Sequence, residues 1–136
     1  MEFTWMSRWQ PHLLAILRII VALLFIEHAL IKLFGFPPAG QPGLQEVGTL
    51  LWIGGVIELV TGVLVLLGLL TRTAAFVAAG EMAVAYFMVH APRGFYPAVN
   101  MGEGAILFCF VFLYIAAAGP GAWSVDGART RGRAVR

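Results

Sequence analysis

The chain has little charge and almost no cysteine. Only 12% of its 136 residues are Asp, Glu, Lys or Arg, whereas a soluble domain carries about 25%. The single cysteine, Cys109, excludes an intrachain disulfide, and no C-x-x-C pair indicates a zinc or dithiol site. Instead, 60% of the residues are hydrophobic and the mean hydropathy is +0.87. This balance excludes an ordinary soluble domain and favours an integral membrane protein.

The usual patterns of metal and haem chemistry are also missing. The sequence contains neither the Glu-x-x-His pairs of di-iron bundles nor an H-E-x-x-H helix. Glu27 and His28 are consecutive, so their side chains project about 100° apart on a helix and do not form an easy chelate. His28 and His90 differ in expected depth by about 9 Å, which disfavours a haem held between them. We therefore expect no metal site and no haem.

Four apolar runs separated by helix-breaking residues predict four transmembrane helices, at about residues 13–34, 47–70, 73–90 and 100–118. At 1.5 Å per residue, about 20 residues cross a hydrocarbon core of roughly 30 Å. The short turn at residues 71–73 makes the second and third helices antiparallel neighbours. We predict an all-α, integral membrane four-helix transmembrane bundle over residues 13–118. An N-terminal interfacial segment, 1–12, precedes it, and a basic cytoplasmic tail, 119–136, follows it.

Basic residues predict the orientation of the bundle, because cytoplasmic loops carry an excess of Lys and Arg. Lys32 and Arg93 belong to one side, and the other side holds Arg8, Arg18, Arg72, Arg129, Arg131, Arg133 and Arg136. We expect a multi-pass protein of the plasma membrane (the bacterial inner membrane) with both termini cytoplasmic. Arg18 interrupts the first apolar run and no small-residue cleavage site follows, so the first helix is expected to be retained. The basic tail is expected to contact anionic lipid rather than nucleic acid.

The first predicted helix carries four polar or charged groups: Arg18, Glu27, His28 and Lys32. Each charge near a bilayer centre costs about 2.5–3.5 kcal/mol on insertion scales. A helix that served only as an anchor would not keep such groups. They therefore require partners, which other helices of the chain or of a complex must supply.

Two glutamates lie near the centres of the second and third predicted helices. Glu58 follows Gly55 by three residues and precedes Gly62 by four, so it shares a face with these glycines and with Gly48. Glu81 shares a face with small residues in the same way: Ala74, Ala78 and Ala85. Small residues allow helix backbones to approach closely in lipid. Both carboxylates are therefore predicted to face the interior of the bundle.

Two interpretations of these buried groups remain open. In the structural interpretation, Arg18 and Lys32 pair with glutamates and lock the helices, and the two glutamates share a proton. In the functional interpretation, they form a site for a polar headgroup, a quinone ring or a proton, because ionisable groups within a membrane commonly mark such sites.

An ordered set of motifs across residues 10–126 resembles the DoxX family of small four-helix membrane proteins. The motifs begin with Arg18 and the Phe25–Phe36 segment and continue through the following positions: Gly54-Gly55, Glu58, Gly62, Gly68, Thr71-Arg72, Glu81-Met82-Ala83, His90, Asn100-Met101-Gly102-Glu103 and the Gly119–Asp126 segment. Two residues depart from the family pattern. Ala29 and Met101 stand where the family usually has glycine.

The resemblance implies a link to quinone chemistry. Relatives for which the family is named belong to a thiosulfate:quinone oxidoreductase, although fold-level kinship does not transfer the thiosulfate substrate. Our leading hypothesis is a DoxX-like small subunit, associated with a membrane redox complex, that handles quinone/quinol or protons. The candidate catalytic residues are Glu58, Glu81, His28 and His90. The candidate cofactor-binding residues are Arg18, Glu27, Lys32 and Glu103.

Other functions remain open. One alternative is a non-catalytic structural, assembly or lipid-binding subunit of a membrane complex, and a further one is a small transporter acting as a dimer. The expected partners are the lipid bilayer and other membrane or redox-complex subunits, or a second copy of the chain, with no nucleic acid. The sequence leaves open whether the chain itself catalyses a reaction.

Overall fold

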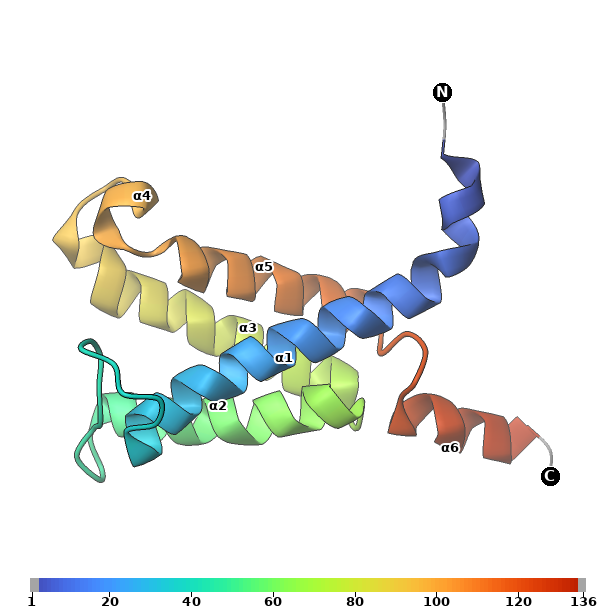
Figure 1. Cartoon of the computed structure of the whole chain (residues 1–136), viewed down its shortest axis with the longest axis horizontal. Coiled ribbons are helices and arrows are strands. Elements are labelled where there is room, and N and C mark those ends of the chain that lie inside the picture. Colours follow the sequence, from blue (N-terminus) through green and yellow to red (C-terminus); the bar gives the residue numbers. More distant parts are fainter. Residues whose placement is uncertain (1–2, 135–136) are drawn as a thin grey trace.

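The computed structural model describes residues 3–134, and within them all the regular structure is helical (Figure 1). The long helices are α1 (Gln10–Phe34), α2 (Leu50–Leu67), α3 (Thr71–Ala85) and α5 (Glu103–Ala118). The shorter helical elements are η1 (Thr4–Trp9), η2 (Tyr86–His90), η3 (Ala91–Arg93), α4 (Pro97–Asn100) and α6 (Val125–Ala134). The predicted interfacial segment 1–12 is described from Phe3 onward, and Arg136 lies outside the described residues.

Three helical segments are long and apolar enough to cross a membrane: Thr4–Phe34, Leu50–Leu67 and Thr71–Arg93. The fourth, α5, is apolar but has only 16 residues, about 24 Å at 1.5 Å per residue. Large apolar side chains such as Phe76 and Phe110 are 66% and 65% exposed on the outside of these helices. Such an apolar exterior suits lipid rather than water. The predicted all-α membrane bundle is confirmed.

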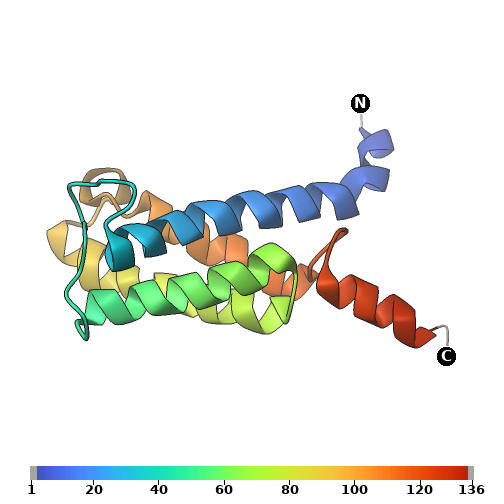
Figure 2. The same cartoon turned by 60° about the horizontal axis from the view of Figure 1, so that its bottom comes forward.

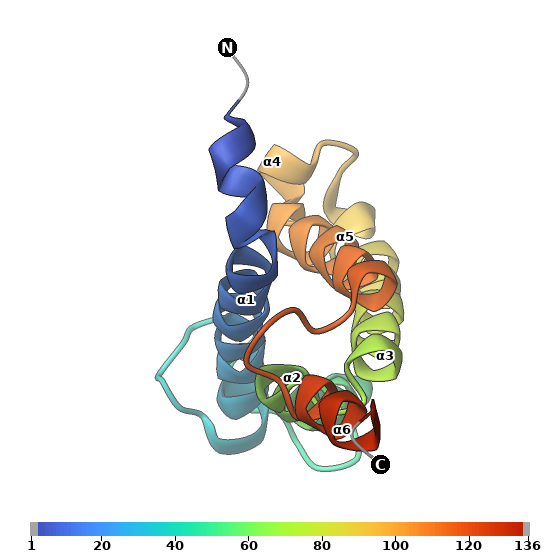
Figure 3. The ribbon, with the colours of Figure 1, turned by 90° about the vertical axis from the view of Figure 1, so that its right-hand side faces the viewer.

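The helices form two antiparallel pairs. α1 packs mainly on α2 and α3 mainly on α5, while α2 and α3 join the pairs, and Figures 2 and 3 show these four helices arranged side by side. One end of the bundle, called here the loop end, holds residues 35–49 and 91–102. The other, called the terminal end, holds η1, the α2–α3 turn and α6 (Figure 1).

α2 is shorter than the predicted helix 47–70 because its ends are set by capping. Gly48 has φ +86°, outside the helical region, and Thr49 accepts a hydrogen bond from the backbone N–H of Trp52 at 3.3 Å. Gly68, with φ +67°, ends the helix in the left-handed conformation that glycine adopts without steric cost. Gly48 therefore does not belong to the small-residue face of α2, contrary to the sequence-based prediction.

Gly55 and Gly62 do lie on the face of α2 that meets α1. A Cβ atom at residue 62 would lie 2.8 Å from Ile26 Cγ1, and one at residue 55 would lie 3.1 Å from Lys32 Cβ. The absence of side chains at these two positions allows the α1 and α2 backbones to approach closely. This approach places Lys32 beside α2.

The third and fourth predicted helices, 73–90 and 100–118, are each subdivided. α3 ends at Ala85 and continues as a π-helical turn over Tyr86–His90. α5 begins at Glu103, because Met101 has φ +61° and separates it from the short α4. The expected tail, 119–136, contains the helix α6.

Candidate functional site

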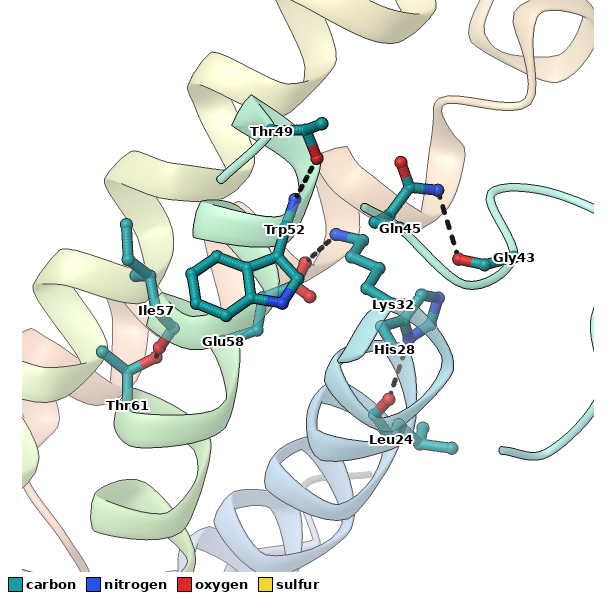
Figure 4. Close-up of polar contacts among 10 residues, drawn as sticks. All are labelled: Leu24, His28, Lys32, Gly43, Gln45, Thr49, Trp52, Ile57, Glu58 and Thr61. Carbon is teal, nitrogen blue, oxygen red and sulfur yellow. Dashed lines mark hydrogen bonds and ion pairs between the residues drawn. The ribbon is translucent and has the colours of Figure 1, made fainter. Parts of the chain in front are cut away.

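The centre of the candidate site is an ion pair between α1 and α2. Lys32 Nζ donates to Glu58 Oε1 at 2.6 Å, as Figure 4 shows. Lys32 is 8% exposed and Glu58 is 1% exposed. Removing both charges from water is unfavourable unless they meet with good geometry, and the short distance indicates a strong charge-assisted hydrogen bond. Within residues 3–134 this is the one ion pair.

Glu81 brings a second carboxylate to this pair from α3. A Cβ atom at residue 54 would lie 3.2 Å from Glu81 Oε1, so Gly54 leaves room for the Glu81 side chain against α2, one turn from Glu58. Glu81 is close enough to Glu58 and Lys32 for both charges to act on it. The Glu81 side chain is therefore directed toward α2, the helix that carries Glu58.

One oxygen of each carboxylate is buried without a hydrogen-bond partner. These atoms are Glu58 Oε2 and Glu81 Oε2. A buried polar atom without a partner is costly, and here two carboxylates, one on α2 and one on α3, each leave one acceptor unpaired. Either carboxyl group would become a hydrogen-bond donor by binding a proton.

His28 lies one turn before Lys32 on α1 (Figure 4). Its Nδ1 is 2.9 Å from the carbonyl oxygen of Leu24. Because a carbonyl can only accept, Nδ1 carries the hydrogen, and in the neutral ring Nε2 is therefore the free acceptor. The His28 side chain is exposed, so its ring is open to the surroundings of the bundle.

The α1–α2 loop is attached to α1 at Lys32 itself. The backbone N–H of Gln45 donates to the Lys32 carbonyl at 2.8 Å. The Gln45 amide donates in turn to the carbonyls of Pro42 and Gly43 at 2.6 and 3.2 Å, the latter drawn in Figure 4. The loop end is thus closed over Lys32 by backbone and side-chain hydrogen bonds.

Arg18 does not pair with a glutamate, contrary to expectation. It is 0% exposed, and all five of its N–H groups point at backbone carbonyls. The acceptors are the oxygens of Val65, Leu66, Pro120, Ala122 and Trp123. The first two belong to the last turn of α2, where free carbonyls and the helix dipole attract a cation. Its donors are fully used, so Arg18 ties α1 to α2 and to the α5–α6 loop.

His90 lies in a separate cluster at the loop end. Its Nδ1 is 3.1 Å from the Asn100 carbonyl, and its ring stacks on Tyr86 with 6.3 Å between centroids. The Asn100 amide donates to Tyr86 Oη at 3.3 Å and to the Gly94 carbonyl at 2.8 Å. The two remaining candidates, Glu27 and Glu103, are exposed. Neither makes a side-chain hydrogen bond within residues 3–134.

Asn100 and Asp126 are organising residues that belong to the family motifs but were not among the predicted site residues. Asn100 is 1% exposed and its side-chain oxygen accepts from Gly102 N–H at 2.8 Å. The signal available for it was an Asn two residues before a Gly, which is a common turn arrangement. Asp126 accepts from the backbone N–H groups of Leu70 and Thr71 at 3.0 and 2.9 Å. No local pattern could have revealed this contact across 55 residues.

Among the described residues, no three His, Cys, Asp or Glu side chains converge on one point. The cluster of Lys32, Glu58 and Glu81 has one basic and two acidic groups. Fully ionised, it would carry one uncompensated negative charge in an apolar bundle. One bound proton would balance it, so the chemistry that this arrangement suits is proton binding.

The fold and the site together define an all-helical membrane protein with a buried, charge-paired cluster between its helices. The model of the DoxX family matches residues 13–91, and the chain belongs to this family. It is also 44% identical over 125 residues to a Haemophilus influenzae protein named "Uncharacterized protein", with 89% of this chain and 93% of that protein covered. No solved structure matches the chain.

Proposed function

We propose that the protein is a small subunit associated with a membrane redox complex, in which the Lys32–Glu58–Glu81 cluster binds and transfers a proton. The observation that carries this proposal is the pair of buried, unpartnered oxygens, Glu58 Oε2 and Glu81 Oε2. Lys32 compensates one carboxylate, and a proton compensates the other. Loss of that proton leaves one negative charge uncompensated in the cluster, so the site favours rebinding a proton after each transfer.

Quinol is the proposed source of that proton. Oxidation of a quinol to a quinone releases two electrons and two protons, and the electrons would pass to a redox centre of the partner complex. The protons would leave one at a time through the cluster and the free Nε2 of His28. Histidine suits the exposed step because one ring nitrogen can accept a proton while the other donates one. A quinone is soluble in lipid and can approach His28 along the outside of α1.

The proposed orientation places the loop end outside the cell and both termini in the cytoplasm of a bacterium. Its support is the distribution of arginines, since Arg72, Arg129, Arg131 and Arg133 all lie at the terminal end (Figures 1 and 3). Cytoplasmic segments near transmembrane helices carry this excess. The cluster would then lie toward the outer half of the membrane.

Infrared spectroscopy of the purified protein in lipid tests the proton site. The wild type should show a carboxylic acid C=O band that Glu58→Gln or Glu81→Gln removes or shifts. Glu27→Gln and Glu103→Gln, which change exposed glutamates, should leave it unchanged. A wild-type spectrum without a protonated carboxyl at neutral pH, or one that neither buried variant alters, would refute proton binding at the cluster.

The quinone assignment has a separate test. A short-chain ubiquinone added to the same samples should perturb this band and should quench tryptophan fluorescence. Saturable binding should weaken at least tenfold in His28→Ala. Binding that is unsaturable, or equal in both proteins, would remove quinone from the proposal while leaving the proton site standing.

A second candidate function is an assembly or lipid-binding subunit. The observation that favours it is the fully satisfied Arg18, which joins three parts of the chain and has no donor left for a ligand. Under this alternative, Glu58→Gln preserves the function of the complex. Enlarging Gly55 would instead separate α1 from α2 and prevent assembly.

A further inference from the structure

The terminal end holds an arginine-lined groove that the proposed proton chemistry does not use. It has a volume of about 790 Å³ and lies between α6, the start of α3 and the segment after α5. Its lining residues are Arg72, Pro120, Asp126, Gly127, Arg129, Thr130 and Arg133. Three of them are cationic and one is anionic.

One face of α6 forms a wall of this groove. Asp126, Arg129, Thr130 and Arg133 are spaced by three, one and three residues, so they share one face of a helix. Arg131 lies on the same helix but outside the groove lining. Two arginines that are spaced by one turn therefore point to one region, and a third does not.

The anionic group of the groove is already engaged. Asp126 Oδ1 accepts from Leu70 N–H at 3.0 Å, and its Oδ2 accepts from Thr71 N–H and Thr71 Oγ1 at 2.9 and 2.8 Å. Partial burial alone would raise the pKa of Asp126, but these hydrogen bonds and nearby Arg129 outweigh it and lower that pKa. The carboxylate therefore holds α6 against the α2–α3 turn and does not pair with the arginines by hydrogen bonding.

The groove arginines differ in how far they are used. Arg72 donates to the carbonyls of Ala116 and Ala117, at the end of α5. Arg129 and Arg133 make no hydrogen bond or ion pair within residues 3–134. Two free guanidinium groups beside a third, fixed one form a region suited to an anion with several oxygen acceptors.

The surroundings of the groove place it at the level of lipid headgroups. Trp5, Trp9 and Trp123, at the terminal end of the bundle, are 58%, 48% and 61% exposed. Exposed tryptophans mark the boundary between membrane and water. Leu70, next to the Asp126 contact, is 58% exposed. An anion held here would thus have apolar surface beside it, as the phosphate of a lipid does.

We propose that this groove, between α6 and the bundle, binds the headgroup phosphate of an anionic phospholipid. The lipid phosphate accepts from Arg129 and Arg133, with Arg72 at the wall, while its acyl chains lie along the apolar surface of the bundle. Basic pockets between helix ends are a common form of anionic-lipid site. The bound lipid would hold α6 at the membrane surface.

The test uses the full-length protein in neutral detergent, titrated with dioleoylphosphatidylglycerol and followed by native mass spectrometry. Arg129→Gln and Arg133→Gln should each weaken binding about fivefold and together about 25-fold, as expected for one basic residue each at an anionic surface. Arg131→Gln is the matched control, because it removes the same charge from the same helix outside the groove. It should change binding less than twofold.

Further measurements keep the result interpretable. Arg129→Lys should restore most of the affinity, and circular dichroism should show unchanged helix content in all variants. Phosphatidylcholine should bind at least tenfold more weakly than phosphatidylglycerol. Equal losses in the three glutamine variants would mean diffuse attraction and overturn the groove. Displacement of the lipid by millimolar inorganic phosphate, with no preference for the lipid, would overturn the lipid assignment.

Discussion

At the scale of single residues, the buried groups divide into those that meet an opposite charge and those that meet carbonyls. Lys32 meets Glu58, whereas Arg18 meets the open end of α2 and the α5–α6 loop. Both solutions remove a cation from lipid. Only the contact of Lys32 with Glu58 has unpartnered carboxylate oxygens nearby. Only this contact therefore suits the proposed binding of a proton.

Removing Lys32 should destabilise the protein more than removing an exposed cation. Lys32→Met leaves Glu58 buried without its counter-charge, which should lower the free energy of unfolding by about 3–5 kcal/mol. The double variant Lys32→Met/Glu58→Leu should recover most of that loss, because a packed apolar pair replaces the ion pair. Unfolding in detergent at pH 8 measures both, with Arg93→Met as the exposed control. A single variant as stable as the wild type would contradict the buried pair.

Asp126 should make the attachment of α6 depend on pH. Its pKa is lower in the folded protein than the usual value of about 3.9, so its stabilising effect is complete above that value. The effect is lost as the pH falls through the lower, folded pKa. Hydrogen exchange of residues 125–134, corrected for intrinsic rates, should therefore show α6 loosening in strongly acidic solution.

Asp126→Asn is the matched variant for this measurement. It keeps the shape of the side chain but not its charge, and it should cost about 1 kcal/mol, as for the loss of a helix cap. Its α6 should exchange faster than the wild type near neutral pH, with little further pH dependence. Identical pH profiles in the two proteins would show that Asp126 does not control α6.

At the scale of elements, the α1–α2 contact decides where the site forms. Gly62 and Gly55 lie on this contact, and neither has room for a larger side chain beside α1. The same approach that removes space at these glycines brings Lys32 within 2.6 Å of Glu58. The small-residue face and the charged pair are thus two consequences of one helix crossing.

Alanine substitutions at two helical glycines should have opposite effects. In Gly62→Ala the new Cβ would lie 2.8 Å from Ile26 Cγ1, and such overpacking costs about 1–3 kcal/mol. Gly80 has nothing within 4 Å of the corresponding position, so Gly80→Ala should gain up to about 1 kcal/mol of helix propensity. Thermal unfolding of both variants in the same detergent provides the comparison. Stabilisation by Gly62→Ala would mean that the two helices do not cross there.

The elements were predicted better than their ends. The lengths of the apolar runs were sufficient to predict the four long helices, because a run long enough to cross a membrane is a strong signal within one stretch of sequence. The ends depend on left-handed residues such as Gly68 and Met101, and a non-glycine residue in that conformation leaves little trace in a sequence. The helix α6 was missed because a run of arginines and glycines has low apolar content, and its attachment through Asp126 is tertiary.

At the scale of the whole molecule, the two ends differ in charge and in construction. The terminal end carries the arginines of α6, the Arg18 carbonyl contacts and the exposed tryptophans. The loop end carries the Asn100–His90 cluster, and the α1–α2 loop at this end is hydrogen-bonded to the Lys32 carbonyl. This polarity is the basis of the proposed orientation.

Cysteine labelling of intact bacterial cells should test that orientation. In a Cys109→Ala background, cysteines at Gly40 and Gly94 should react with a membrane-impermeant maleimide added outside. A cysteine at Gly132 should react only after lysis, because α6 is proposed to lie in the cytoplasm. Reaction at Gly132 before lysis, without reaction at Gly40, would reverse the orientation and place the cluster in the inner half of the membrane.

The amino-acid sequence alone was enough to predict a membrane bundle of the DoxX family, with Glu58 and Glu81 on the small-residue faces of their helices. Hydropathy, the spacing of small residues and the order of motifs are properties of the sequence itself. A carboxylate that faces lipid is energetically costly, so it is expected to face other helices. Which groups meet became clear only from the packing of the helices. Glu58 pairs with Lys32, Arg18 donates to backbone carbonyls, and His90 contacts Asn100. These partners depend on how the helices are rotated and how the loops close, and the packing of residues distant in the sequence sets both.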